Sequence, residues 1–287
     1  MFFIVYCVLS LLRGSDFGGL PYDAGMPALA YSVSGRSQFP NFDNPSTLSM
    51  VRKDGIGLSF AYSSNGFGDI LSYGSKAKLR NLTAVSLFTK GGGFTYRLLG
   101  KKRLTGLDFE KEYSIDEFQI VFADLIYYKI YGGIGLKYYY VRYAEASISD
   151  GLPHVNLDTG NGFSVNAGAA LTFKYFDLGF FLRNIISGIF YHDYPKDVLG
   201  LSGGVGVVAA PINSISLSLD CLGERDGKIQ YSAGCCFRPI KWALLSAGYS
   251  LPDKALSGGV EVNYSTNDFV LSYRKNSVFL TWRLYLK

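Results

Sequence analysis

The sequence predicts an all-β fold, an antiparallel transmembrane β-barrel of about 14 strands with 12 as the alternative. The first observation is a strict alternation of apolar and polar residues, clearest in the last third of the chain, where Ile215, Leu217 and Leu219 interleave with serines. The second is the length of the alternating runs, about 9–11 residues, which is what a tilted strand needs to cross a bilayer. The third is composition: 22 Tyr, 21 Phe and 34 Gly accompany only 18% charged residues. A soluble β-sandwich also alternates, but here an outward apolar face recurs along the chain and would have no partner in water.

The N-terminus predicts an export signal over residues 1–15. An apolar run from Met1 to Leu12 is followed by Arg13-Gly14-Ser15 and is too short to span a membrane as a helix. No Lys or Arg precedes this run, so a buried strand of the mature protein remains the alternative.

Residues 16–50 do not alternate and contain four prolines. Asn44 followed by Pro45 predicts a helix start, with Asn44 as the cap and Pro45 at the first helical position. The segment is either an exposed leader or a plug that folds back into the barrel. The residues expected on the plug or ligand path are Phe39, Phe42, Asn44, Pro45 and Leu48.

The barrel is expected over residues 51–287. Its predicted strands are 55–64, 80–90, 92–100, 112–125, 129–144, 161–174, 176–190, 198–210, 212–222, 228–238, 240–250, 254–264, 267–274 and 276–286. The longest loops are expected at 65–79 and 145–160, on the extracellular side. Lys101-Lys102-Arg103 is expected at a solvated loop tip, not in a nucleic-acid-binding patch, because no basic face accompanies it.

Strand parity places a set of charged side chains on the lumen side. A charge that faces lipid near the midplane costs about 2–4 kcal/mol, so these charges should point inward. They either form an ion-pair network that supports the barrel, or contact a substrate head group or anchor the plug. The set is Lys137, Lys174, Asp177, Arg183, Asp220, Glu261, Arg274 and Arg283.

Clustered tyrosines, such as Tyr138-Tyr139-Tyr140, are expected in the interfacial girdles, although alternate members would line a hydrophobic path. Cys221, Cys235 and Cys236 are expected to be free thiols. If Asp226-Gly227 is a two-residue turn, Cys221 lies opposite Ser232.

Residues for catalysis or cofactor binding are sparse. His154 and His192 are the only histidines, no Cys/His/Asp cluster has metal-ligand spacing, and no nucleophile elbow or phosphate loop is present. The sequence therefore predicts no enzyme activity, no metal and no cofactor.

Short motifs resemble one family. Asn44-Pro45-Ser46 resembles the Asn-Pro-Ala motif of the FadL-like long-chain fatty-acid transporters and their PorV-like relatives, with Ser46 in place of Ala. The run Phe176–Ile185 resembles a recurring "LG-x-x-x-x-N-hydrophobic" strand of the PorV-like branch.

The resemblance implies a barrel in the bacterial outer membrane that binds or passes small hydrophobic molecules. The alternative is a non-transporting, PorV-like docking or assembly component of a protein-secretion system. The expected partners are thus the bilayer and either a hydrophobic small molecule or an exported protein, and no nucleic acid. A continuous apolar pocket that reaches the plug would favour transport, and a lumen filled by charge networks would favour docking.

Overall fold

The computed structural model describes residues 41–51, 53–63, 82–105, 109–149, 152–192, 198–223, 227, 229–251, 254–274 and 277–286. The export signal predicted over residues 1–15, Phe39 and the loop predicted over 65–79 lie outside these residues. No helix in the described part of the chain is long and apolar enough to cross a membrane.

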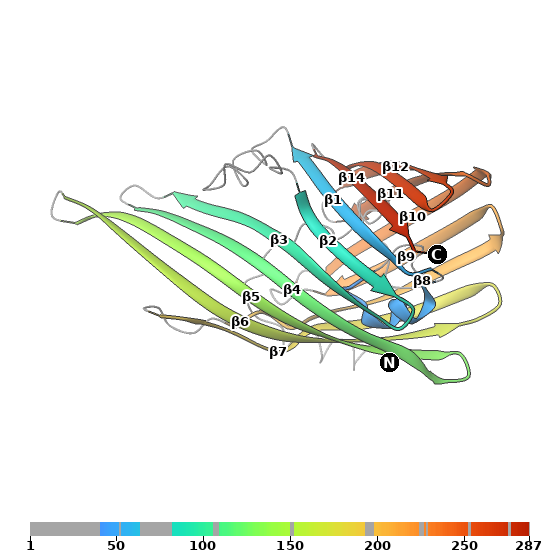
Figure 1. Ribbon diagram of the computed structural model, residues 1–287, viewed down its shortest axis with the longest axis horizontal. Coiled ribbons are helices and arrows are strands. Elements are labelled where there is room, and N and C mark those ends of the chain that lie inside the picture. Colours follow the sequence, from blue (N-terminus) through green and yellow to red (C-terminus); the bar gives the residue numbers. More distant parts are fainter. Residues whose placement is uncertain are drawn as a thin grey trace.

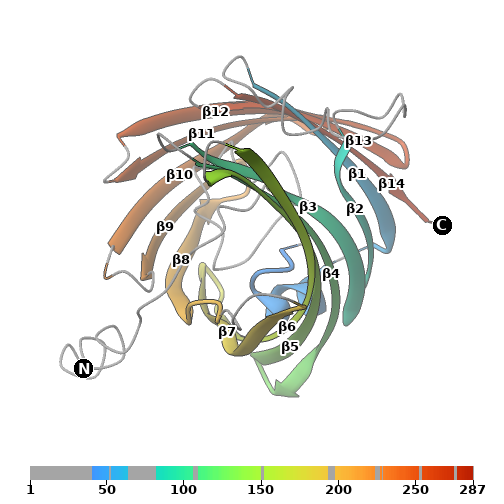
Figure 2. The same ribbon diagram turned by 90° about the vertical axis from the view of Figure 1, so that its left-hand side faces the viewer.

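The described strands form one closed antiparallel barrel of fourteen strands (Figures 1 and 2). Each strand pairs with its neighbours in sequence, and β1 pairs with β14 to close the barrel. The predicted fold class and the count of fourteen are therefore confirmed. The strands are β1 (Gly55–Ser63), β2 (Leu82–Thr89), β3 (Gly92–Thr105), β4 (Phe109–Tyr127), β5 (Ile130–Ser149), β6 (Leu152–Thr172), β7 (Phe176–Tyr191), β8 (Ser202–Ile212), β9 (Ile215–Gly223), β10 (Ile229–Ile240), β11 (Ala243–Leu251), β12 (Ala255–Tyr264), β13 (Asn267–Arg274) and β14 (Ser277–Tyr285).

Alternation separates an apolar outer face from a more polar inner face. In β4 the outward Phe118, Ile120 and Phe122 are exposed, whereas Glu117, Gln119 and Val121, which alternate with them, are buried. Because successive side chains of a strand point to opposite faces, this pattern orients every other residue of β4.

Aromatic side chains ring the outer face near both ends of its apolar band. Phe118 and Tyr127 on β4 belong to the two rings and are nine residues apart. That separation is about 30 Å along a strand, or roughly 23 Å of height at a tilt of about 40°. A transmembrane barrel has an apolar band of about 25 Å between aromatic girdles. The ring nearer the tight turns includes Tyr127, Tyr128, Tyr175, Trp242 and Tyr264, and the other includes Phe118, Tyr138, Phe163, Tyr231, Tyr249 and Tyr273.

The connections β2–β3, β4–β5, β6–β7, β8–β9, β10–β11 and β12–β13 have two or three residues each and lie at one end of the barrel, called here the short-turn end. Gly91 in the first of these turns has a φ of 95°, a conformation that glycine adopts without strain. β1 begins and β14 finishes at this end, because Gly55 pairs with Tyr285 on one side and with Phe88, next to the β2–β3 turn, on the other.

Strands β3 to β6 continue well past the girdle at the opposite end, as Figure 1 shows. The loop predicted over 145–160 is therefore wrong: Glu145 pairs with Asn156, and only residues 150–151 separate β5 from β6. Lys101-Lys102-Arg103 likewise lies in β3 and pairs with β4, not at a loop tip. Both predictions failed because these extensions leave the apolar band, so their polar composition resembled that of loops.

The described cysteines Cys221, Cys235 and Cys236 are free, as predicted. Their register differs by one residue from the prediction, since Cys221 pairs with Tyr231 and Ser232 pairs with Asp220. The reason is the connection, which spans the five residues between Gly223 and Ile229 in place of a two-residue turn.

Candidate functional site

Residues 41–51, called here the inner segment, lie against the inner face of β4, β5 and β6 near the short-turn end. Figure 2 shows their short helix within the barrel outline beside these strands. Phe42 and Leu48 are completely buried. Gln119 of β4 donates a hydrogen bond from Nε2 to the Phe42 carbonyl oxygen (2.8 Å), and the Gly91 N–H donates to the Leu48 carbonyl (3.2 Å). The segment is thus bound to the wall through its backbone at both ends.

The helix in this segment begins where the sequence predicts a start, at Pro45 after Asn44, and forms the 3₁₀ helix η1 (Pro45–Met50). Pro45 suits the first turn because its fixed φ is helical. The Asn44 side chain does not cap the helix; its Oδ1 accepts a hydrogen bond from Ser46 Oγ (2.7 Å). Thr47 Oγ1 instead donates to the Asn44 carbonyl (2.9 Å).

A pair of glycines on the wall provides the space for η1. Gly133 of β5 and Gly168 of β6 are cross-strand partners. A Cβ atom at Gly133 would lie 2.6 Å from the Pro45 carbonyl carbon and 2.7 Å from the Ser46 nitrogen. A Cβ atom at Gly168 would overlap Asn44 Oδ1. Glycine in a strand interior marks a place where another backbone approaches closely, and here that backbone is the inner segment.

A buried ion-pair network joins the inner segment to four strands. Arg97 of β3 and Lys137 of β5 both bind Glu117 of β4, at 2.9 Å and 3.0 Å. Asp43 of the inner segment lies 3.5 Å from Lys137 Nζ and 3.7 Å from Arg183 of β7. Because buried charges need partners, these contacts tie the position of Asp43 to the wall.

The electrostatic potential at Asp43 is positive. Burial would raise the pKa of the Asp43 carboxyl, but the cations of Arg183 and Lys137 outweigh burial, with Arg97 adding to their effect. They hold this pKa well below its ordinary value. Asp43 is therefore charged at neutral pH, and its charge favours the position of the segment seen in the structure.

Arg183 stands where β7 changes register. It is the last β7 residue paired with β8, opposite Ser202, and the next residue, Asn184, has a φ of 58°. Asn184 is held there by Asn166, whose Oδ1 accepts from its backbone N–H (3.0 Å), and by its own Nδ2, which donates to the Gly200 carbonyl (2.9 Å). Asparagine tolerates this left-handed conformation better than most residues. The irregularity places the Arg183 guanidinium beside Asp43.

Apolar clusters lie on both sides of the network. Toward the short-turn end, Phe42 and Leu48 pack with Val121 and Phe88. Toward the opposite end, an inner apolar cluster is made of Ile115, Tyr139, Val141, Ile189 and Leu199. The network therefore separates this cluster from the apolar packing of the inner segment.

The charged residues predicted in the lumen have different surroundings. Lys137 and Arg183 belong to the network at Asp43. Glu261 and Arg283 form a second buried pair (3.0 Å), in which Arg283 also lies 3.6 Å from Asp268. Arg274 donates from Nη2 to Ser250 Oγ (2.8 Å).

Three of the predicted charges remain, Lys174, Asp177 and Asp220. Asp177 is buried on the inner face, and Asp220 is half-buried. Lys174 differs from the prediction: it is exposed in the turn between β6 and β7, with its Nζ 4.9 Å from the centre of the Tyr175 ring. Parity placed it inward because the predicted strand was extended by two residues past Thr172, the last residue of β6.

Sequence reasoning missed Asp43, Arg97 and Glu117. Parity carried a signal for Arg97 and Glu117, since alternation in β3 and β4 puts both on the lumen side, where they pair in register. Asp43 had no such signal, because it lies in an irregular segment where parity does not apply. No group of three or more His, Cys, Asp or Glu side chains that would hold a metal ion occurs among the described residues.

The fold and the inner segment define a class of protein: a transmembrane barrel of fourteen strands with an N-terminal segment bound to its inner wall. No protein-family model matches the sequence, and no curated protein matches it. Solved structures do match. The monoaromatic hydrocarbon channel CymD superposes with a TM-score of 0.64 at 10% identity, over 95% of this chain and 99% of CymD.

Two further structures have the same architecture. A FadL homologue of Pseudomonas aeruginosa matches with a TM-score of 0.58 at 12% identity, over 93% of this chain and 98% of the homologue. The toluene transporter TodX of Pseudomonas putida matches with a TM-score of 0.58 at 11% identity, over 94% of this chain and 98% of TodX. The chain therefore has the FadL-like barrel fold.

Proposed function

We propose that this chain is an outer-membrane barrel that binds or passes small hydrophobic molecules and belongs with the FadL-like transporters. The observation that carries the proposal is an inner segment bound across the charge network, with an apolar cluster directly on its far side. The inner segment would be the described part of a plug that extends over residues 16–50. No bond is made or broken in such a passage, so no catalytic residue is required.

The inner apolar cluster is the part of the lumen suited to a hydrophobic guest. Ile115, Val141 and Ile189 contribute aliphatic side chains, Tyr139 adds an aromatic ring, and all four are buried in the structure. Apolar contact of this kind contributes about 25 cal/mol for each Å² removed from water. A molecule that enters from the end opposite the short-turn end would reach this cluster before it reaches Asp43.

The network then accounts for retention and release. A hydrophobic molecule is disfavoured beside buried charges. It would therefore stop before it reaches Asp43, in the inner apolar cluster, while the inner segment is bound. Movement of the segment would break the contacts of Asp43 with Lys137 and Arg183 and open the way to the short-turn end. The plug would thus act as a gate whose closed state is stabilised electrostatically.

The names of the similar structures support transport. They are a monoaromatic hydrocarbon channel, a toluene transporter and a FadL homologue, and none of these three names refers to a secretion system. The docking alternative has no support among them. Outer-membrane location is proposed on the same basis, together with the apolar band and its two aromatic rings.

The proposal is tested by binding of radiolabelled toluene and oleate to the purified full-length chain. We expect saturable binding of at least one of them, and a loss of about tenfold in affinity in Val141→Asn, because the amide replaces two methyl groups that would contact the guest and each such group contributes about 0.8 kcal/mol. Val270→Asn is the matched control, because Val270 is also buried but belongs to a separate cluster with Phe279. Absence of saturable binding for both ligands, or an equal loss in the two variants, would refute the proposed site.

A further inference from the structure

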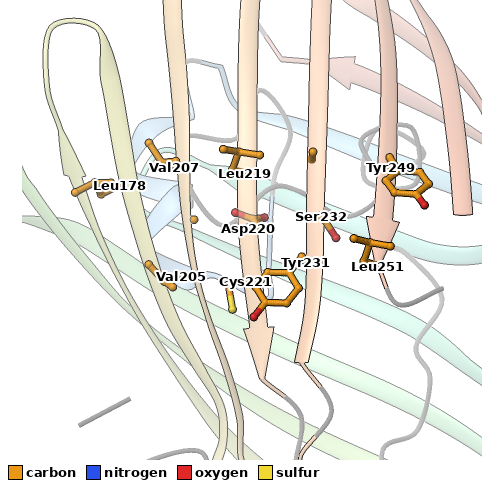
Figure 3. Close-up of a pocket in the computed structure, with 12 residues that line it drawn as sticks. Leu178, Val205, Val207, Leu219, Asp220, Cys221, Tyr231, Ser232, Tyr249 and Leu251 are labelled. Atoms are coloured by element: carbon orange, nitrogen blue, oxygen red, sulfur yellow. The ribbon is translucent and has the colours of Figure 1, made fainter. Parts of the chain in front are cut away.

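The outer wall contains a groove that the proposed function does not use. It has a volume of about 470 Å³ and runs across β8 to β11, with Leu178 of β7 at one side (Figure 3). This volume lies within the range of roughly 300–1,000 Å³ typical of small-molecule sites. The side chains that define this outer groove are Val205, Leu219, Cys221, Tyr231, Ala233 and Tyr249.

The groove opens to the membrane side of the wall, not to the lumen. Leu219 and Tyr231 are among the exposed large hydrophobic residues, whereas Ser218 and Ser232, each next to one of them in sequence, are buried on the inner face. Asp220 and Ser232 also line the groove, but their side chains belong to the inner face, so they contribute to its floor. The other residues of the lining present almost only carbon.

Two small residues create the hollow. Cys221 pairs with Tyr231, and Ala233 pairs with Leu219, so each small side chain faces a large one across the β9–β10 pair. Large side chains stand on the flanking strands as well, with Leu251 opposite Tyr231 and Tyr249 opposite Ala233. The wall is therefore thin at Cys221 and Ala233 and is bordered by bulky groups.

The groove has a polar rim at one end. Tyr231 and Tyr249 are each the third residue from the end of their strand that lies away from the short-turn end, in the aromatic ring on that side of the apolar band. Tyrosine is favoured at this depth because its ring is apolar and its hydroxyl reaches the polar head groups. The groove thus runs from the head-group level into the apolar band.

We propose that the outer groove is a binding site for one acyl chain of a membrane lipid, whose head group lies beside Tyr231 and Tyr249. The groove is continuous with the apolar band that contacts the bilayer, so an acyl chain is the group that meets it there. An acyl chain in this groove would contact Leu, Val and aromatic carbon, and each buried methylene contributes by the hydrophobic effect. This inference is independent of the transport proposal, because the groove and the inner apolar cluster lie on opposite faces of the wall.

The test uses the full-length chain in phosphatidylethanolamine vesicles that contain a trace of phosphatidylethanolamine with a diazirine in its acyl chain. After irradiation, labelled peptides are located by mass spectrometry. We expect labelling around Cys221 and Ala233 to exceed that of outward residues of β12 and β13 at the same depth by about fourfold. This factor is the gain in occupancy expected if an acyl chain in the groove buries one methylene more than it does elsewhere on the wall. Even labelling of all outward strands would overturn the proposal.

Ala233→Leu fills the groove and should lower the labelling of β9 and β10 to the level of the other strands. The matched control is Ala247→Leu, since Ala247 is also an outward alanine but does not line the groove. Thermal melting followed by circular dichroism verifies that both variants fold, and Ala233→Val replaces Ala233→Leu if the latter does not. Labelling unaffected by filling the groove would refute the site.

Two other occupants would each give a different result. If toluene or oleate displaced the lipid label from β9 and β10, the groove would belong to the transported molecule. If Cys221 instead formed cross-links between copies under a bismaleimide, the groove would be an interface between barrels. Either result would overturn the acyl-chain assignment, and neither depends on whether Val141→Asn weakens ligand binding in the lumen.

Discussion

Replacing Asp43 by Asn removes one of two carboxylates that balance three cations. With Asp43 the network contains Arg97, Lys137 and Arg183 against Asp43 and Glu117; without it, only Glu117 remains. Breaking a buried pair from one side typically costs about 3–5 kcal/mol, because the remaining charge is left uncompensated. Lys137 keeps its 3.0 Å contact with Glu117, so the low end applies, about 3 kcal/mol. This cost destabilises the bound state of the inner segment and leaves the backbone hydrogen bonds between the barrel strands intact.

The assay is the rate at which a thiol at position 46 reacts in intact membranes, in a chain whose four native cysteines are replaced. Ser46 is completely buried, so Ser46→Cys reacts only when the segment leaves the wall. A loss of about 3 kcal/mol shifts the equilibrium by roughly a hundredfold, since each 1.4 kcal/mol is a factor of ten. The labelling rate should rise by the same factor if detachment is fast and reversible.

The matched control is Asp116→Asn. Asp116 pairs with Arg142 at 3.2 Å, but the Arg142 side chain is 54% exposed, and such pairs contribute at most about 1 kcal/mol. Its labelling rate should stay within a few-fold of the parent. Equal rates for Asp43→Asn and Asp116→Asn would refute the claim that the network holds the inner segment, and fast labelling of the parent would show that there is no plug.

Three further predictions follow from the same structure. Because the pKa of Asp43 is lowered when the segment is bound, the charge of Asp43 stabilises the bound segment fully above the ordinary pKa of 3.8. This stabilisation is lost as pH falls below that value. Acid should therefore accelerate the labelling of Ser46→Cys, measured with a thiol reagent that is active at low pH. Gly133→Ala should release the segment, because the new methyl group would lie 2.6 Å from its backbone, whereas Gly258→Ala meets its nearest atom at 3.6 Å and should leave the labelling rate unchanged. Leu271→Lys, on the outer face near the middle of β13, should lower the free energy of unfolding in bilayers by about 2–4 kcal/mol, and Leu256→Lys near the boundary by about 0–1 kcal/mol. Equal costs for the two lysines in urea titrations would contradict the assigned depth of the apolar band.

The proposals for the two faces of the wall rest on the same physical contrast. The inner face carries charged and hydroxyl side chains, and the inner apolar cluster lies next to the network. The outer face is apolar throughout its band, so a hollow there contacts acyl chains and not water. A hydrophobic guest in the lumen and a lipid on the wall would therefore be held by the same hydrophobic effect, in sites separated by one layer of strands.

Alternation by itself was enough to predict the class of fold, the number of strands and the limits of several of them. β13 spans Asn267–Arg274, the predicted residues, because one face of it meets lipid and the other meets the polar interior. The strand extensions around Glu145 and Arg103 escaped prediction because both of their faces lie beyond the apolar band. There the apolar–polar contrast disappears, although the backbone ladder continues.

Only the tertiary structure decided which charges meet. The sequence determined that Lys137 and Arg183 face inward, since a lipid-facing charge is costly, but it carried no information on a partner from the irregular segment before the barrel. The place of Asp43 depends on the Gly133–Gly168 pair that admits η1 and on the register change beside Arg183, and both are relations between neighbouring strands that the pattern of a single strand does not show. Side-chain periodicity reports the medium on each face of one strand, whereas a site built across β3 to β7 depends on how the strands are aligned.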